Sequence, residues 1–443
     1  MTSWVITDAT TLDGSSVDVV IEDGRISRLA EAGSPDLSIV PEDRRYDAAG
    51  RLVTPTLTEP HVHLDATLTA GEPTWNDSGT LAEGIRIWGE RKRTLEAADV
   101  RARAERAVEW YAANGVTRIR THADTTEESL TGVRALLELR EAVADLVDLQ
   151  VVAFPQDGVF TNESHEDLLR EALELGADVV GAIPHNEHTL EDGVTSIDLA
   201  MDLAERYDRP VDLHIDETDD PGSRFTAVLA SEAMKRGIGD RVAASHATAM
   251  HSYPNAYAAK VISLLAESGV DVITNPPDNA VLQGRYDDYP RRRGHTRIDQ
   301  LQEAGVTVGL GHDSVMDPWY HYGRADPLDA AFVLLHYAHM SGRGDVGTLW
   351  EMLTGANASV FGDDAYGLEE GAPGSLVVYD APDPFNALRT RAPRTLVLKD
   401  GRQIARTEPA TTRVRRADGD RRLTFEREHF SPRSRPTTDR RSS

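Results

Sequence analysis

The chain has 443 residues, no cysteine, and a formal net charge of -27 from 74 acidic and 47 basic residues. The absence of cysteine excludes disulfide bonds, thiolate metal ligands and a cysteine nucleophile. The acidic balance argues against polymeric DNA or RNA as a partner, because phosphate contacts need clustered positive charge. Neither a long apolar run nor a signal-peptide pattern is apparent, so we expect a cytoplasmic protein without a membrane partner.

Only four of the basic residues are lysines. An acidic, lysine-poor composition is typical of a halophilic-type surface that stays hydrated in high salt. A GC-rich genome also favours arginine over lysine, so both explanations stay open. A melting temperature that rises between low and molar salt would favour the halophilic-type surface.

The first 55 residues alternate polar and apolar positions between Asp-Gly turns at Asp13 and Asp23, which predicts short antiparallel strands. Similar strands are predicted near the other end of the chain, over residues 374–381 and 394–406. We therefore predict one small β-sandwich domain built from both termini, with residues 1–55 and 368–412 as its two parts.

Eight short apolar segments lie between these flanks, and each ends in polar residues. Helical patterns with apolar residues at i, i+3 and i+4 separate them. Strand alternating with helix in this way predicts a (β/α)8 TIM-type barrel over residues 56–367, with its chemistry at the C-terminal strand ends. The predicted strands lie from residue 51 onward and in 115–124, 148–158, 177–187, 209–218, 241–250, 269–279 and 305–314.

The last segment, residues 413–443, has ten arginines against five acidic residues, together with Pro, Ser and Thr. This composition predicts a flexible, Arg-rich tail. A solvated arm or an oligomer contact is favoured over nucleic-acid binding.

Histidines and acidic residues gather at the predicted strand ends. His61 and His63 are one residue apart at the end of the first strand, where alternation points both rings to the same side. His214 follows the fifth strand and Asp313 the eighth. Three nitrogens and one carboxylate suit a divalent ion such as Zn²⁺ or Fe²⁺, with Mn²⁺ also possible. The competing interpretation makes His214 and Glu217 a surface pair on a helix.

Three more residues at strand ends could act on a substrate. His246 could hydrogen-bond a metal-bound hydroxide, or it could be a buried core histidine. Glu217 could carry protons. Gln156 offers both a donor and an acceptor to an amide-like substrate edge, or it could cap a loop.

Long motifs over the barrel and the sandwich resemble the amidohydrolase superfamily and, within it, the bacterial cytosine deaminase family. They include "EPHVHLD" (59–65), "VVAFPQDG" (151–158), "LHIDETDD" (213–220), "ASHATAMHSY" (244–253), "LQGRYDDYPRRRG" (282–294) and "GHDSVMDPWY" (311–320). The Arg-rich tail lies outside the resemblance. The zinc deaminases that use a Pro-Cys-x-x-Cys motif are excluded, because the chain has no cysteine.

The resemblance implies hydrolytic deamination of a free pyrimidine base, cytosine to uracil plus ammonia, through a metal-bound hydroxide. It implies that His61, His63, His214 and Asp313 bind one divalent metal ion, iron or zinc. The other implied roles are catalysis by Glu217, His246 and Asp313, binding of the base by Gln156, and pocket walls formed by Leu81 and Trp319. It also implies a homo-oligomer, such as a hexamer.

One position departs from that family. An Asp usually follows the metal-binding Asp in cytosine deaminases, and Ser314 stands there in this chain. The smaller, uncharged side chain leads to the hypothesis that a 5-substituted cytosine such as 5-methylcytosine is a substrate. Isocytosine, creatinine and aminotriazines stay open as alternative substrates. The non-enzyme alternative is a metal-binding scaffold barrel, which would need no proton-carrying residue such as Glu217.

Overall fold

A computed structural model describes residues 4–33, 40–363 and 365–426, and the chain forms two compact units. The sandwich unit falls within Met1–Thr56, Met340–Glu351 and Ala365–Ser443, and the barrel unit within Leu57–His339 and Met352–Asp364. The segment Met340–Glu351 lies inside the range predicted for the barrel but groups with the terminal strands. In the part of the chain that the structure describes, no helix is both long and apolar enough to span a bilayer.

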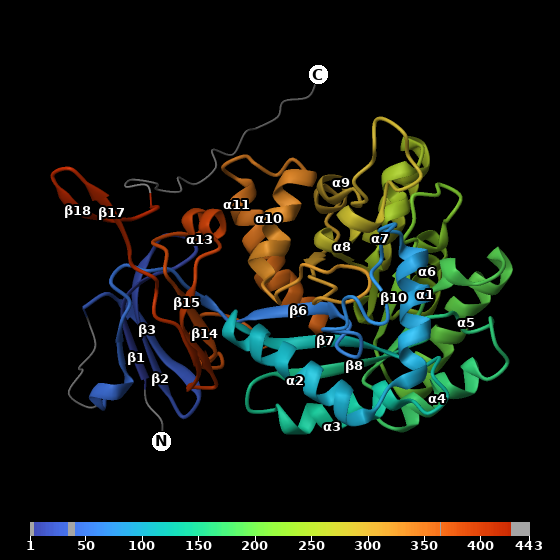
Figure 1. Cartoon of the computed structure of the whole chain (residues 1–443), viewed down its shortest axis with the longest axis horizontal. Helices are drawn as coiled ribbons and strands as arrows, with labels where there is room; N and C mark the ends of the chain where they lie inside the picture. The colour runs from blue at the N-terminus through green and yellow to red at the C-terminus, as the bar shows by residue number, and fades with distance from the viewer. Residues whose placement is uncertain (1–3, 34–39, 364, 427–443) are drawn as a thin grey trace. The chain divides into compact units, whose positions relative to one another are not determined.

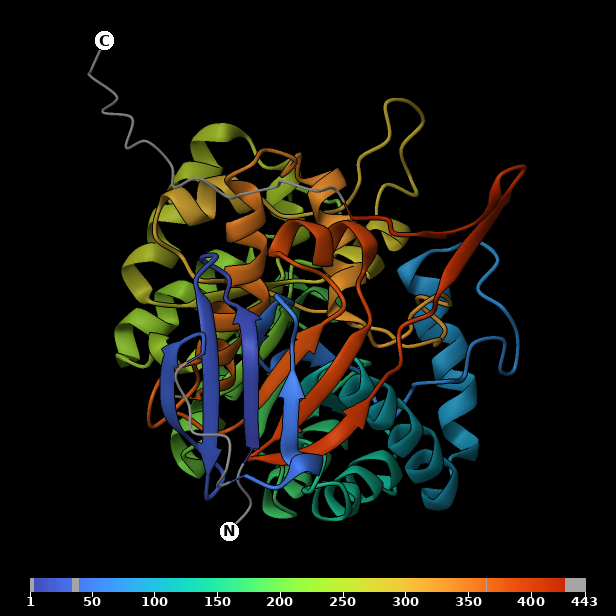
Figure 2. The same ribbon diagram turned by 90° about the vertical axis from the view of Figure 1, so that its left-hand side faces the viewer.

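The sandwich unit consists mainly of two four-stranded sheets (Figure 2). One has the order β3-β2-β1-β4 and the other β16-β15-β14-β5. Apolar side chains from both sheets, including Ile6, Val19, Val378 and Leu396, form one buried core. The bounds are Trp4–Thr10 (β1), Ser16–Glu22 (β2), Arg25–Glu31 (β3), Arg45–Asp47 (β4), Val53–Pro55 (β5), Leu376–Tyr379 (β14), Arg394–Lys399 (β15), Arg402–Arg406 (β16), Asp345–Glu351 (α11) and Pro384–Thr390 (α13).

A two-stranded hairpin, β17 (Thr412–Arg416) and β18 (Gly419–Leu423), belongs to the same unit. All of its residues are exposed. It lies in the segment predicted to be a flexible tail, and an Asp-Gly pair at Asp418 marks its turn. Residues 427–443 of that predicted tail lie outside the described residues.

The barrel unit contains eight parallel strands in the order β13-β12-β11-β10-β9-β8-β7-β6. Strands β6, β7, β8 and β10 are labelled in Figure 1. The predicted (β/α)8 fold is therefore confirmed. Most strands are buried along their whole length, as expected for parallel strands covered by helices. Their bounds are Leu57–Val62 (β6), Val116–Asp124 (β7), Asp148–Phe154 (β8), Val179–Ala182 (β9), Val211–Ile215 (β10), Val242–His246 (β11), Asp271–Thr274 (β12) and Val308–Leu310 (β13).

Helices alternate with these strands, and local signals mark their ends. Thr189 caps the first turn of α5 by accepting a 3.0 Å hydrogen bond from Asp192 N, and Gly269 ends α7 with a φ of 74°. The bounds are Leu81–Arg91 (α1), Ala97–Ala113 (α2), Thr131–Ala142 (α3), His165–Glu174 (α4), Leu190–Tyr207 (α5), Phe225–Arg236 (α6), Asn255–Ser268 (α7), Pro276–Leu282 (α8), Ile298–Glu303 (α9), Pro327–Tyr337 (α10) and Asn357–Phe361 (α12).

The barrel closes where the last strand meets the first. Val62 and Asp313 form a parallel bridge, in which Asp313 N donates to His61 O at 2.9 Å and His63 N donates to Asp313 O at 3.1 Å. This bridge fixes the backbone of His61, His63 and Asp313 side by side. Residues distant in sequence are thereby held at one rim of the barrel.

Candidate active site

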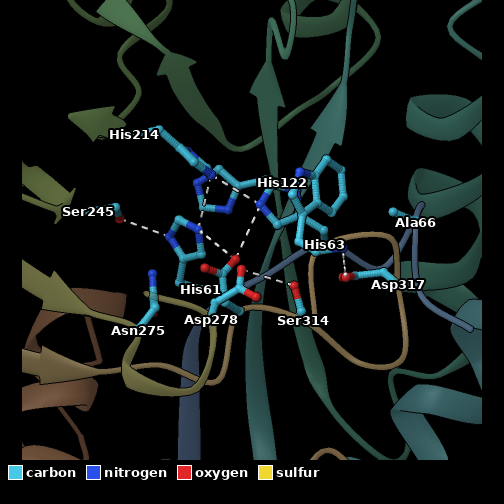
Figure 3. A network of polar contacts seen from close by, with 12 residues as sticks. His61, His63, Ala66, His122, His214, Ser245, Asn275, Asp278, Ser314 and Asp317 are labelled. Carbon is cyan, nitrogen blue, oxygen red and sulfur yellow. Dashed lines mark hydrogen bonds and ion pairs between the residues drawn. The ribbon is translucent and has the colours of Figure 1, made fainter. Parts of the chain in front are cut away.

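Four side chains from three strand ends meet at the C-terminal rim of the barrel, and Figure 3 shows the three histidines among them. The Nε2 atoms of His61 and His63 lie 3.2 and 3.1 Å from Nε2 of His214. Oδ1 of Asp313 lies 3.5 Å from the Nε2 atoms of both His61 and His63. All four side chains are buried. The structure therefore places the four residues predicted as metal ligands together.

The chemistry of this donor set fits a divalent metal ion. Burial lowers the pKa of His61, His63 and His214 well below that of a free histidine, and neighbouring imidazoles lower it further. Neutral imidazoles carry nitrogen lone pairs, which repel one another when they converge so closely. A cation among them removes that repulsion. Three imidazole nitrogens and one carboxylate match the ligands of borderline ions such as zinc and iron.

The tautomer of His61 is set by a hydrogen-bonded chain behind it. Ser245 Oγ donates to Asp212 Oδ1 at 2.6 Å and lies 2.8 Å from Nδ1 of His61. Although burial opposes it, contacts with His122 and Arg120 hold the pKa of Asp212 below that of a free aspartic acid. The ionised carboxylate accepts the hydrogen bond of the Ser245 hydroxyl, so Ser245 Oγ in turn accepts a hydrogen bond from Nδ1–H of His61. Nε2 of His61 is then left with a lone pair that faces His63 and His214.

Backbone strain occurs at two of the candidate residues. His246 and Asp313 have φ angles of 71° and 70°, in the left-handed region that non-glycine residues seldom adopt. Such strain persists only where the surrounding structure imposes it, and it concentrates at functional sites. At Asp313 the bridge to β6 imposes it.

Glu217 is held by its neighbour Asp216, which lies just after β10. The carboxylate of Asp216 accepts hydrogen bonds from Ser223 Oγ, from the Phe225 amide, and from both the amide and the hydroxyl of Thr226, at 2.6–3.0 Å. These contacts tie the loop to the start of α6. Burial, and secondarily the charge of a nearby carboxyl group, raises the pKa of Glu217 well above that of a free glutamic acid. A neutral Glu217 can donate a proton.

His246 and Glu217 share one partner. The side-chain amide Nδ2 of Asn279 lies 3.0 Å from His246 Nδ1 and donates to Glu217 Oε1 at 3.3 Å. With Nδ1 accepting from the amide, the ring proton of His246 lies on Nε2, which has no hydrogen-bond partner among the described residues. Burial lowers the pKa of His246 to about 3, so the ring is neutral. His246 therefore offers an N–H donor to a bound molecule.

These groups line a small cavity of about 20 Å³, room for one water molecule. A wider cavity of about 830 Å³ shares Leu81 and Glu217 with it and extends over the loops after the strands. Ser314, predicted to bind the substrate, does not line the small cavity. The lining residues are His63, Leu81, Gln156, His214, Glu217, His246, Asp278, Asp313 and Trp319.

One wall of the small cavity is apolar and tightly packed. Trp319 and Leu81 belong to a cluster with Trp88 and Leu282. Helix α1 approaches the indole so closely that a Cβ on Gly84 would lie 2.4 Å from Trp319 Cδ1. Trp319 therefore serves both as a core residue and as a wall of the cavity. Gln156 lies on the same cavity and is only 4% exposed.

Comparison with known proteins agrees with this geometry. The model of the Amidohydrolase family matches residues 44–405. The chain belongs to the amidohydrolase family. Among solved structures it is similar to 5-methylcytosine deaminase from Klebsiella pneumoniae liganded with 5-fluorocytosine, with a TM-score of 0.89 and 42% identity, covering 93% of this chain and 99% of that chain. The phosphonocytosine complex of the same enzyme gives 0.88 and 43%, covering 92% and 99%.

Among characterised sequences, this amidohydrolase is 30% identical to N-isopropylammelide isopropyl amidohydrolase from Pseudomonas sp. (strain ADP), over 82% of this chain and 88% of that protein. The predicted membership in the superfamily, and within it in the cytosine deaminase-like family, is confirmed. The chain is a hydrolase that acts on C–N bonds, and its chemistry is metal-dependent deamination of a heterocycle.

Sequence reasoning about this amidohydrolase missed several residues that support the site. Ser245 and Asp212 were not singled out, although Ser245 immediately precedes His246. Asp278 and Asn279 lie in the segment "NPPDN", which the sequence placed at the seventh strand end without giving these two a role. The sequence did contain a signal for Asp278 and Asn279, because both directly follow Pro276 and Pro277. A proline pair restricts the backbone and so fixes where the next side chains lie.

Another histidine of the amidohydrolase, His122, lies beside the proposed metal ligands. His122 has its ring centre 4.0 Å from that of His61, and its Nε2 lies 3.8 Å from Asp212 Oδ1. His61, His122 and Asp212 thus form another group with the spacing of metal ligands. Nδ1 of His61 is hydrogen-bonded to Ser245, so Nε2 is the nitrogen that His61 has left to bind a metal ion. That Nε2 faces His214, which favours the group of His61, His63 and His214.

Proposed function

We propose that the chain hydrolyses the exocyclic amine of free cytosine-type bases, with 5-methylcytosine turned over faster than cytosine. The products are thymine and ammonia from 5-methylcytosine, and uracil and ammonia from cytosine. The observation that carries the proposal is that Glu217, a buried carboxyl group whose pKa is raised, lies with Gln156 on one cavity beside the histidine cluster. A proton donor and an amide on one cavity suit a ring with an amine and an oxo group.

The proposed roles follow from the atoms that face the cavity. Gln156 holds the 2-oxo edge of the base through its amide. Glu217 donates its proton to ring nitrogen N3, which makes C4 more electrophilic. His246 orients the attacking water through Nε2–H, and Asp313 accepts a proton from that water.

His61, His63, His214 and Asp313 would hold a divalent ion, iron or zinc. When bound, such an ion supplies Lewis-acid activation of the attacking water. The protein residues supply the remaining proton transfers and the alignment of the base. Burial of the whole site strengthens each of these interactions, because little bulk water screens them.

Two facts support a 5-substituted base. Ser314 turns its hydroxyl to Asp278 Oδ2 at 3.2 Å, so the position next to the proposed ligand Asp313 presents no side chain to the cavity. The solved structures to which the chain is 42% and 43% identical are of a 5-methylcytosine deaminase.

The test is ammonia release by the purified protein after reconstitution with Fe²⁺, Zn²⁺ or Mn²⁺ in turn, at low and at molar salt. The panel is 5-methylcytosine, cytosine, 5-fluorocytosine, isocytosine, creatinine and N-isopropylammelide. We expect the highest kcat/KM for 5-methylcytosine, with cytosine second. A preference for isocytosine, creatinine or the triazine would overturn the proposed substrate class. No turnover with any metal would favour the scaffold alternative.

A further inference from the structure

Asp278 is the one carboxyl group of the small cavity to which the sequence gave no role. It lies on the short helix α8, which follows β12, and is 3% exposed. Its Oδ2 accepts a hydrogen bond from Ser314 Oγ at 3.2 Å (Figure 3). Its Oδ1 is buried without a hydrogen-bond partner among the residues that the structure describes. Asp278 thus presents an acceptor to the cavity.

A second acceptor occupies the same corner. Oδ2 of Asp313 is also buried without a hydrogen-bond partner in the described part of the chain. Asp278 lies close enough to Asp313 for the two carboxyl groups to interact directly. Buried acceptors without a donor are costly and rare in folded proteins. A bound molecule that brings an N–H₂ group to this corner would satisfy both oxygens.

Two neighbouring polar groups, Asn279 and Ser314, do not supply those hydrogens. Asn279 directs its amide to His246 and Glu217, and Ser314 has only one hydroxyl hydrogen, already given to Asp278 Oδ2. In the proposed reaction the exocyclic amine is bonded to the attacked carbon, so it must lie beside Asp313. Asp278 and Asp313 then both lie close to the amine.

We propose that Asp278 binds the exocyclic amino group of the substrate, with Ser314 holding the carboxyl group in the required orientation. This inference rests on the proposed function and adds a specificity-determining residue to it. A pair of acceptors favours a base that carries an amine at C4. The same pair repels the carbonyl oxygen that replaces the amine in the product. Asp278 therefore distinguishes substrate from product.

The experiment measures the competitive inhibition constants of two unreactive ligands, 4-aminopyridin-2-one and pyridin-2-one, against deamination of 5-methylcytosine by the metal-loaded enzyme. The two differ in the amine and both lack ring nitrogen N3. For the wild type we expect the amino ligand to bind about 10- to 100-fold more tightly, as for one or two hydrogen bonds to a carboxyl group. In Asp278→Val, a variant of similar volume, we expect the ratio to fall to about twofold.

Asp278→Asn tests the same point with less change in shape, and we expect it to reduce the ratio as well. The matched control is Asp271→Asn, at the opposite end of β12 and outside the cavity, which should keep the wild-type ratio. Circular dichroism and metal content confirm that each variant is folded and loaded. A wild type without preference for the amino ligand, or Asp278 variants that keep that preference, would overturn the inference. If the wild type deaminates neither cytosine nor 5-methylcytosine, the proposed function fails instead, and this inference fails with it.

Discussion

Replacing Ser245 by alanine should weaken metal binding without touching a proposed ligand. The Ser245 hydroxyl links Nδ1 of His61, at 2.8 Å, to Oδ1 of Asp212, at 2.6 Å. Alanine removes both contacts and leaves a buried N–H and a buried carboxylate oxygen facing a void. His61 is then free to carry its proton on Nε2, the nitrogen that faces His63 and His214.

The expected loss can be estimated from these contacts. Hydrogen bonds behind a histidine ligand typically contribute 10- to 100-fold in metal affinity, roughly 1.4 to 2.7 kcal/mol. A single hydrogen bond to a charged group contributes about 1.5 to 3 kcal/mol, which agrees with that range. We therefore expect the Kd for Zn²⁺ to rise about 10- to 100-fold in Ser245→Ala.

The assay is competition for Zn²⁺ between the metal-free protein and a chromogenic chelator. Ser196→Ala is the matched control, because Ser196 is 1% exposed and its hydroxyl donates to Gly193 O within α5, away from the site. It should leave the Kd unchanged. A Ser245→Ala protein that is folded and binds Zn²⁺ within twofold of the wild type would refute the reasoning about the tautomer of His61.

Three further predictions concern acid–base groups. Glu217→Gln keeps the shape of the side chain but removes its proton, so kcat should fall about 10²- to 10⁴-fold in a steady-state assay, and unchanged turnover would exclude Glu217 as the proton donor. Asn279→Ala removes the donor shared by Glu217 and His246 and should lower kcat about 10- to 100-fold while KM changes little. A raised KM with an unchanged kcat would mean instead that Asn279 binds substrate. Burial raises the pKa of Asp271 from 3.8 to about 6, so its ionisation should reduce the free energy of unfolding by at most about 3 kcal/mol as pH rises from about 4 to 6. Asp271→Asn should lack that decrease in urea titrations at several pH values, and an equal decrease in both proteins would assign it to other groups.

The barrel could be predicted because its signals are local and repeated. Each strand is a short apolar run, and glycines such as Gly269 mark the helix ends that precede strands. The pairing of the sandwich sheets was harder to specify. Strand β5 pairs with β14, which is far away in sequence, and Met340–Glu351 groups with the terminal strands. Such contacts depend on tertiary packing, which a single sequence reports only weakly.

The proximity of the proposed metal ligands was also predictable, because parallel strands bring their C-terminal ends to one rim. The alternation of side chains along a strand was enough to predict that His61 and His63 face the same side. The position of the last strand was enough to predict that Asp313 lies near them. The contacts behind them were not predictable in the same way. Asn279 reaches His246 and Glu217 from a helix whose direction is set by the turn at Pro276 and Pro277.

Ser314 illustrates the limit of reading a site one position at a time. From the sequence, a serine in place of the family's usual aspartate implied a pocket with one carboxyl group fewer. In the structure, Asp278 from helix α8 lines the cavity, and the Ser314 hydroxyl binds that carboxyl group. A serine small enough to leave space for Asp278, and polar enough to orient it, accounts for both residues together. Their side chains meet although 36 positions separate them, so the two positions should be varied as a pair.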